Sequence, residues 1–161
     1  MPLEERWRRA DAIERGNLQF VVADPDGDMT LIALSKTPDV WAAGVEEYGI
    51  VNWRTMYDHG SPGLRLYQAG LIGAPQIDPK VYDAVSPLTC LAQVKAPLLV
   101  LQGENDIRAP AEEAHQVVDF IREKGGVVDA HFYPDEGHGF SKPENPKDAL
   151  RRTIEWFDKH L

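Results

Sequence analysis

The sequence has one cysteine, few basic residues and no long apolar run. Cys90 alone cannot form an internal disulfide or a cysteine-rich zinc site. There are 17 Lys and Arg residues against 26 Asp and Glu, and the resulting net charge of −9 argues against binding to nucleic-acid phosphates or to an anionic membrane surface. No apolar run approaches the roughly 18 residues of a membrane-spanning helix.

What remains is an ordinary globular composition. The 161 residues are 43% hydrophobic, which fits a single domain over residues 1–161 with a sizeable core. Residues 1–16 are charged throughout and do not resemble a signal peptide, so the expected compartment is the cytoplasm.

Short apolar runs alternate with amphipathic segments along the chain. Strands are predicted at 18–23, 41–48, 96–102 and 127–133, and helices at 3–15, 28–36, 110–124 and 146–160. This alternation predicts a three-layer α/β/α domain with about four mainly parallel strands in sequential order. Residues 52–92 are expected to form an irregular excursion over the sheet edge, with short helical pieces such as Pro79–Ala84.

Acidic and histidine side chains follow the predicted strands. In parallel sheets, function gathers at the loops beyond the carboxyl ends of the strands, which here are residues 24–28, 103–110 and 134–140. Asp106 lies in the second loop and His138 in the third. Such a pair can serve as the acid and base of a hydrolase triad, although alone each residue is more commonly a helix cap or a solvated side chain.

These residues lie in runs that resemble a known family. APLLVLQGENDIRAP (96–110) and VVDAHFYPDEGHGFSKPENP (127–146) are similar to the catalytic domain of the prolyl oligopeptidase family, in which the pattern is H-G-x-x-D-x-R-V-P, then Y-P-x-E-G-H-G-F. Gln102 replaces the His and Ala109 the Val. The resemblance extends back to about residue 10. It implies an α/β-hydrolase fold and serine-peptidase activity, with Asp106 at the acid position and His138 at the base position.

The resemblance fails at the nucleophile. The family has G-x-S-x-G-G before a run like Y-M-T-L, whereas this chain has VADPDGDMTL (22–31), so Asp24 stands in the place of the serine. Pro25 follows it, and proline has no N–H to donate to an oxyanion hole. Val22 and Asp26 replace glycines that allow a tight turn. The resemblance therefore implies that this loop has no serine-peptidase mechanism.

Several alternatives remain for residues 24–28. Asp24 could itself be a nucleophile, as in haloalkane dehalogenases, or the acidic turn could bind calcium; a solvated turn that caps a helix is favoured over both. No cofactor is expected. The other serines considered as nucleophiles occupy no comparable turn; they are Ser35, Ser61, Ser86 and Ser141. Cys90 is expected to be buried.

The resemblance covers only the end of such a catalytic domain. It implies that the first half of the sheet, a second oxyanion donor and a gating propeller would precede this sequence. The chain is then a truncated domain without hydrolytic activity, a fragment or variant of a peptidase that acts on peptides only when complete, or a binding module. The apolar strand at 18–23 would be an uncovered edge, which predicts a homo-oligomer.

Overall fold

The computed structural model describes residues 20–24 and 28–161, and the predicted helix at 3–15 lies outside the described residues. Four strands form one sheet in the order β1-β2-β3-β4. Their bounds are Phe20–Asp24 for β1, Trp41–Glu47 for β2, Leu98–Gly103 for β3 and Val128–Tyr133 for β4. All three neighbouring pairs are parallel, and β3 lies between β2 and β4, so the predicted strand order is confirmed.

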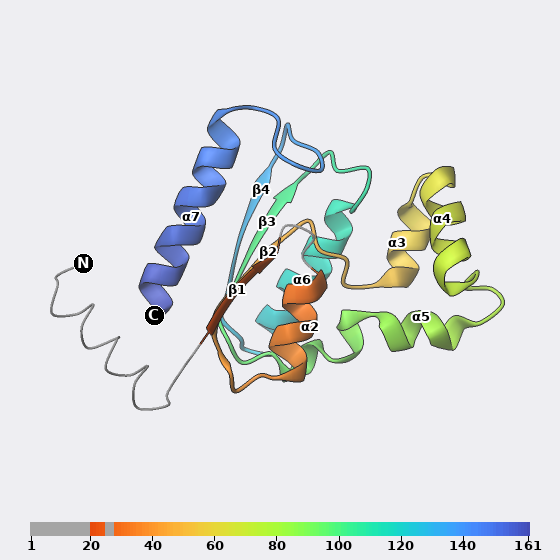
Figure 1. Cartoon of the computed structure of the whole chain (residues 1–161), viewed down its shortest axis with the longest axis horizontal. Helices are drawn as coiled ribbons and strands as arrows, with labels where there is room; N and C mark the ends of the chain where they lie inside the picture. The colour runs from red at the N-terminus through yellow and green to blue at the C-terminus, as the bar shows by residue number, and fades with distance from the viewer. Residues whose placement is uncertain (1–19, 25–27) are drawn as a thin grey trace, which may run out of the picture.

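Helices cover both faces of this sheet (Figure 1). The helix α2 spans Asp28–Lys36, α6 spans Ala111–Glu123 and α7 spans Glu144–His160. Figure 1 shows α7 on one side of the strands and α2 with α6 on the other. The predicted three-layer α/β/α architecture is therefore confirmed.

The strand β3 shows why the layers form. It is buried along its whole length, and its side chains alternate between two apolar cores. Leu98 and Val100 pack with residues of α2 and α6, whereas Leu99 and Leu101 pack with residues of α7. A continuous apolar strand needs cover on both faces, because alternate side chains point to opposite sides of the sheet.

The segment between β2 and β3 is more regular than its sequence suggested. It contains the helices α3 (Trp53–His59), α4 (Pro62–Ile72) and α5 (Pro79–Val85), followed by two short 3-10 turns. Asn52 and Ser61 cap α3 and α4 with their side-chain oxygens. The short helical piece predicted at Pro79–Ala84 is confirmed as α5. The helices α3 and α4 were not predicted, because short helices rich in glycine, proline and aromatic residues depend on caps and neighbours more than on an apolar period.

Among the described residues, no helix is long and apolar enough to cross a membrane.

The strand β1 lies at an edge of the sheet, and among the described residues only β2 pairs with it. An edge strand without a second partner offers backbone N–H and C=O groups to another chain. We propose that a second copy pairs here, with a two-fold axis as the simplest symmetry.

Sedimentation velocity at micromolar concentration tests this proposal. We expect the unmodified protein to sediment as a dimer or larger species. Val22→Lys should shift it toward monomer or insoluble material, because a charge on an edge strand disfavours pairing. Met29→Lys adds the same charge at a side chain that is 61% exposed on α2, and should leave the assembly unchanged. A sharp monomer boundary for the unmodified protein would exclude the pairing.

Candidate active site

The three loops singled out in the sequence follow β1, β3 and β4, at the end of the sheet where the parallel strands have their carboxyl ends. Asp24 is the last residue of β1 and is in register with Glu46 of β2. Residues 25–27 lie outside the described residues, and α2 begins at Asp28. A strand followed, after three residues, by a helix is the order in which α/β-hydrolases place a nucleophile. The predictions for Asp24 itself, including the aspartyl and calcium alternatives, stay untested.

The loops after β3 and β4 bring Asp106 and His138 together. The Nδ1 atom of His138 lies 2.9 Å from Oδ2 of Asp106, so the predicted contact is confirmed. The other carboxylate oxygen accepts hydrogen bonds from the backbone N–H groups of Arg108 (2.7 Å) and Ala109 (2.9 Å). If the carboxylate of Asp106 is ionised it can only accept, so the Nδ1–H group of His138 would donate to it and Nε2 would be left to act as the base. The Asp106 side chain is fully buried, and that of His138 is 18% exposed.

Gln102, near the end of β3, contacts Asp106. Its Nε2 atom donates to the carbonyls of Gly103 and Ala109, both at 3.0 Å, and lies 3.4 Å from Oδ2 of Asp106. The side chain is fully buried in β3. The glutamine that departs from the family pattern thus ties the end of the strand to the loop that carries the acid.

Glu136 holds the loop that carries His138, and sequence reasoning gave it no role. It accepts hydrogen bonds from the backbone and hydroxyl of Ser141, from the backbone of Lys142 and from the amide of Asn145, at 2.6 to 2.8 Å. The hydrogen bond from the Ser141 backbone and the other donors lower the pKa of Glu136 to about 2. The Glu in the run YPDEGHGF and the Asn in KPEN were the available signals.

Aromatic rings pack against the other side of the same loop. Tyr48 follows β2 with a positive φ of 60°, in the left-handed region that non-glycine residues seldom occupy. Its ring centroid lies 4.9 Å from that of His138 and 5.1 Å from that of Phe140. Burial, reinforced by the charge of Glu47, raises the pKa of the Tyr48 phenol, which therefore stays neutral. The imidazole is thus fixed by Asp106 on one side and by the Tyr48 ring on another.

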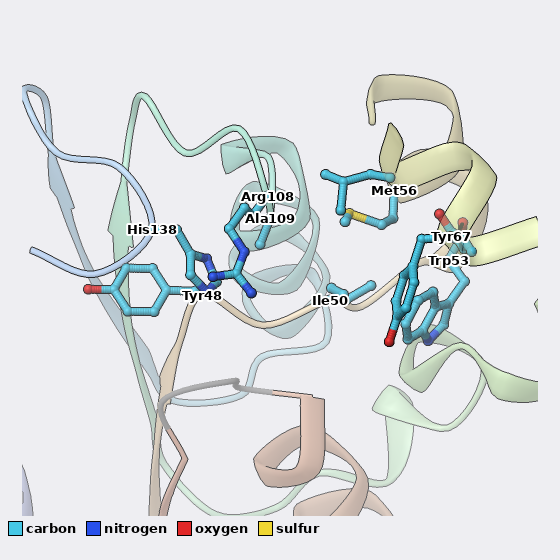
Figure 2. Close-up of a pocket in the computed structure, with 10 residues that line it drawn as sticks. Tyr48, Ile50, Trp53, Met56, Tyr67, Arg108, Ala109 and His138 are labelled. Carbon is cyan, nitrogen blue, oxygen red and sulfur yellow. Dashed lines mark hydrogen bonds between the residues drawn. The ribbon is translucent and has the colours of Figure 1, made fainter. Parts of the chain in front are cut away.

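A cavity of about 340 Å³ opens beside His138. His138, Tyr48 and Arg108 lie at one end of it, and Trp53 and Tyr67 at the other (Figure 2). Most of the lining is apolar or aromatic, from the segment after β2 and from α3 and α4. These residues are Tyr48, Ile50, Trp53, Met56, Leu64 and Tyr67. A space of this size and lining suits an apolar side chain of a ligand.

The other serines considered as nucleophiles lie in helices or make hydrogen bonds within the fold. Ser61 caps α4, and Ser141 donates to Glu136. Ser86 is buried and donates to the carbonyl of Tyr82, and Ser35 is buried in α2. In the part of the chain that the structure describes, no serine hydroxyl is hydrogen-bonded to His138. Cys90 is buried, as expected.

The Glu136 contacts generate a prediction about acid stability. The pKa of Glu136 is lower in the folded state than its ordinary value of 4.5, so its contribution is present above about pH 4.5 and is lost as the pH falls toward 2. We expect Glu136→Gln to lower the urea midpoint at pH 7, because its NH₂ group would face N–H donors. The variant should also lose less stability than the unmodified protein between pH 5 and pH 3.

Asp135→Asn is the matched control. Asp135 is the adjacent carboxylate, pairs with Lys142 at 2.7 Å on the surface and is 71% exposed, so its loss should change the midpoint little. Equal midpoints for Glu136→Gln and the unmodified protein at pH 7 would contradict the assigned role.

Comparisons with known proteins agree with this geometry. The prolyl oligopeptidase family matches residues 27–161. The chain is 39% identical over 136 residues to dipeptidyl aminopeptidase BIII of Pseudoxanthomonas mexicana, covering 81% of this chain and 20% of that enzyme.

Solved structures share the fold. The Pyrococcus horikoshii acylaminoacyl peptidase superposes with a TM-score of 0.77 at 28% identity, over 89% of this chain and 24% of that one. A puromycin-hydrolysing peptidase of Mycobacterium tuberculosis gives a TM-score of 0.81 over 95% of this chain and 24% of its own, where 24% identity supports the fold alone.

The chain spans about one fifth of the length of the dipeptidyl aminopeptidase that it matches. The family match covers most of the sequence, and the sheet, the helices and the two loops after β3 and β4 agree with an α/β-hydrolase peptidase domain. The chain therefore belongs to the prolyl oligopeptidase family, as part of a peptidase catalytic domain.

Proposed function

We propose that this chain keeps the acid and the base of a serine peptidase, Asp106 and His138, but lacks the nucleophile and does not hydrolyse peptide bonds by itself. The contact of 2.9 Å between the two side chains is the observation that carries the proposal. In a complete triad, the base would take a proton from a serine hydroxyl and return it to the leaving amine. Among the described residues, the hydrogen bond of the His138 ring is made by Nδ1, which leaves Nε2 for that transfer.

The nucleophile position supports the second half of the proposal. Asp24 ends β1, Pro25 follows it in the sequence, and α2 begins three residues later at Asp28. Loss of the nucleophile costs on the order of a million-fold in a measured serine protease. Loss of one oxyanion donor by itself costs about 100- to 1,000-fold in rate. With both absent, the acid–base pair has no hydroxyl to activate.

Two other readings of the same residues make different predictions. Asp24 could attack a substrate directly and form an aspartyl ester, which His138 would resolve by activating water. Alternatively, the chain is a fragment or variant of a peptidase that acts only when complete, since the matched segment is 20% of the relative's length.

A second candidate function is binding without cleavage. It is favoured by the apolar cavity beside His138, which has room for a side chain of a peptide whether or not a nucleophile is present. An apolar peptide would then be held at the retained Asp–His pair. This candidate is compatible with the absence of hydrolysis.

Hydrolysis of aminoacyl and dipeptidyl p-nitroanilides and of short acyl esters tests the proposal. We expect the rates of the unmodified protein and of His138→Ala to be equal within error. Asp24→Ser alone should not restore activity, because Pro25 still offers no N–H to an oxyanion. A rate that falls on His138→Ala would refute the proposal.

The variant Asp24→Asn distinguishes the hypothesis that Asp24 is a nucleophile from the proposal that the chain does not hydrolyse substrates. If Asp24 were a nucleophile, the unmodified protein would turn over an ester and the asparagine variant would not. We expect both to be inactive. Activity of the unmodified protein that is lost in Asp24→Asn would establish the aspartyl mechanism in place of ours.

A further inference from the structure

The cavity beside His138 has two walls that lie far apart in the sequence. One wall is the loop after β3, which contributes Arg108 and Ala109. The other is the segment after β2 and the helix α3, which contribute Ile50, Trp53 and Met56. The sheet does not fix the distance between these walls, because α3 lies outside the sheet. Contacts between α3 and the helix after the β3 loop must therefore fix it.

Glu113 connects the two walls. It lies in the first turn of α6, directly after the loop that carries Asp106, and it is fully buried. Its Oε2 atom accepts hydrogen bonds from the backbone N–H groups of Val51 (3.0 Å) and Asn52 (2.8 Å). Its Oε1 atom accepts from the hydroxyl of Thr55 at 2.5 Å. One side chain thus joins the helix after the acid loop to the start of α3, 58 to 62 residues away.

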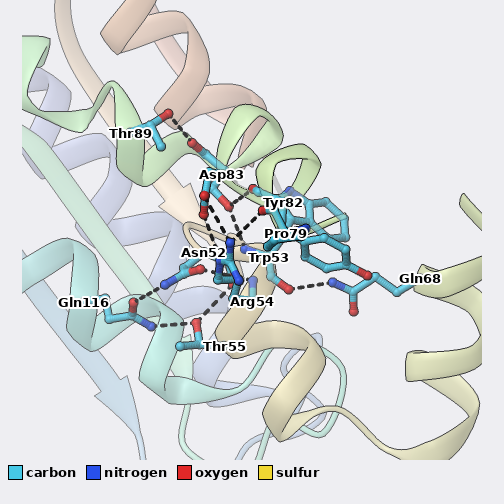
Figure 3. Close-up of polar contacts among 11 residues, drawn as sticks. Asn52, Trp53, Arg54, Thr55, Gln68, Pro79, Tyr82, Asp83, Thr89 and Gln116 are labelled. Carbon is cyan, nitrogen blue, oxygen red and sulfur yellow. Dashed lines mark hydrogen bonds and ion pairs between the residues drawn. The ribbon is translucent and has the colours of Figure 1, made fainter. Parts of the chain in front are cut away.

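Neighbouring side chains complete the attachment, as Figure 3 shows. Gln116, one turn further along α6, accepts from Nδ2 of Asn52 at 3.1 Å and donates to the Thr55 hydroxyl at 3.0 Å. The backbone of Trp53 is held as well: its N–H donates to Ser86 at 3.0 Å, and its carbonyl accepts from Gln68 at 2.7 Å. The indole that forms the far end of the cavity therefore stands on a backbone fixed from several sides.

We propose that Glu113 is the positioning residue of this cavity, which fixes Ile50 and Trp53 at the width that admits an apolar side chain. The proposal rests on the proposed function only in treating the cavity as the ligand site. Glu113 does not line the cavity, so it acts through the backbone that it holds and not through contact with a ligand.

The network works with Glu113 either charged or neutral. Burial raises the pKa of Glu113, while the Thr55, Asn52 and Val51 donors and the charge of His59 act in the opposite direction. If Oε1 gains a proton, it can donate to the Thr55 hydroxyl, since that hydroxyl has a second acceptor in the carbonyl of Asn52 at 3.0 Å. A glutamine would make the same contacts, with its NH₂ facing Thr55 and its carbonyl facing the two N–H groups.

The test compares Glu113→Ala with Glu113→Gln in the full chain labelled with 5-fluorotryptophan. The four tryptophans should give separate ¹⁹F resonances, and Trp53→Phe identifies the signal of Trp53. We expect Glu113→Ala to shift or broaden the Trp53 signal and to leave those of Trp41 and Trp156 unchanged. Glu113→Gln should match the unmodified protein, and so should Glu112→Ala, which removes the exposed carboxylate next in the sequence.

Titration with N-acetyl-phenylalaninamide then reports on the cavity. Loss of the Glu113 contacts should weaken binding about tenfold in Glu113→Ala, the scale of one hydrogen bond, and by less than about twofold in Glu113→Gln. If the unmodified protein does not bind the amide, the binding role of the cavity fails, while the Trp53 signal still decides the role of Glu113. An unchanged Trp53 signal in Glu113→Ala overturns the proposal.

A second variant covers the case in which Glu113→Ala does not fold. Thr55→Val keeps the shape of the side chain and removes only the hydroxyl that Glu113 and Gln116 contact. It should move the Trp53 resonance in the same direction. No movement in this variant would equally overturn the proposal.

Discussion

The hydrogen bond between Asp106 and His138 is the constraint around which the described structure is arranged. The two side chains come from loops that follow different strands, and they meet because β3 and β4 are parallel neighbours whose carboxyl ends lie at one edge. Each partner is supported from behind, Asp106 by Gln102 and two backbone N–H groups, and His138 by its loop and the Tyr48 ring. The pair is therefore built into the fold.

Hydrogen bonds beyond the pair itself hold the surrounding loops in place. The Glu136 contacts close the histidine loop, and the Glu113 contacts attach the cavity wall to the helix after the acid loop. Both carboxylates are fully or almost fully buried, and both are satisfied mainly by N–H and O–H donors and not by cations. Such groups specify one geometry, because an unsatisfied buried carboxylate would be costly. A binding surface would thus persist at this site if, as we propose, the nucleophile has been lost.

Much of the fold could be predicted from the sequence, and less of the site. The run LLVLQG in β3 is apolar on both faces, so its central place in a parallel sheet follows from composition. Asp106 and His138 were found because their motifs are local. The helices Trp53–His59 and Pro62–Ile72 were not predicted, because both are short and are set by caps and long-range contacts. Glu113 and Glu136 escaped notice for a related reason, since a carboxylate in an amphipathic helix or a polar loop resembles a solvated one until its donors are known.

The central claim is that Asp106 holds the imidazole of His138 in one tautomer, with the proton on Nδ1. Proton NMR of the low-field region measures this most directly, since an N–H group in a buried hydrogen bond to a carboxylate exchanges slowly with water. The account predicts one protected imidazole N–H resonance that disappears in both His138→Gln and Asp106→Ala while the remaining spectrum stays folded. A spectrum without a protected imidazole proton, or one whose signal survives in Asp106→Ala, would contradict it.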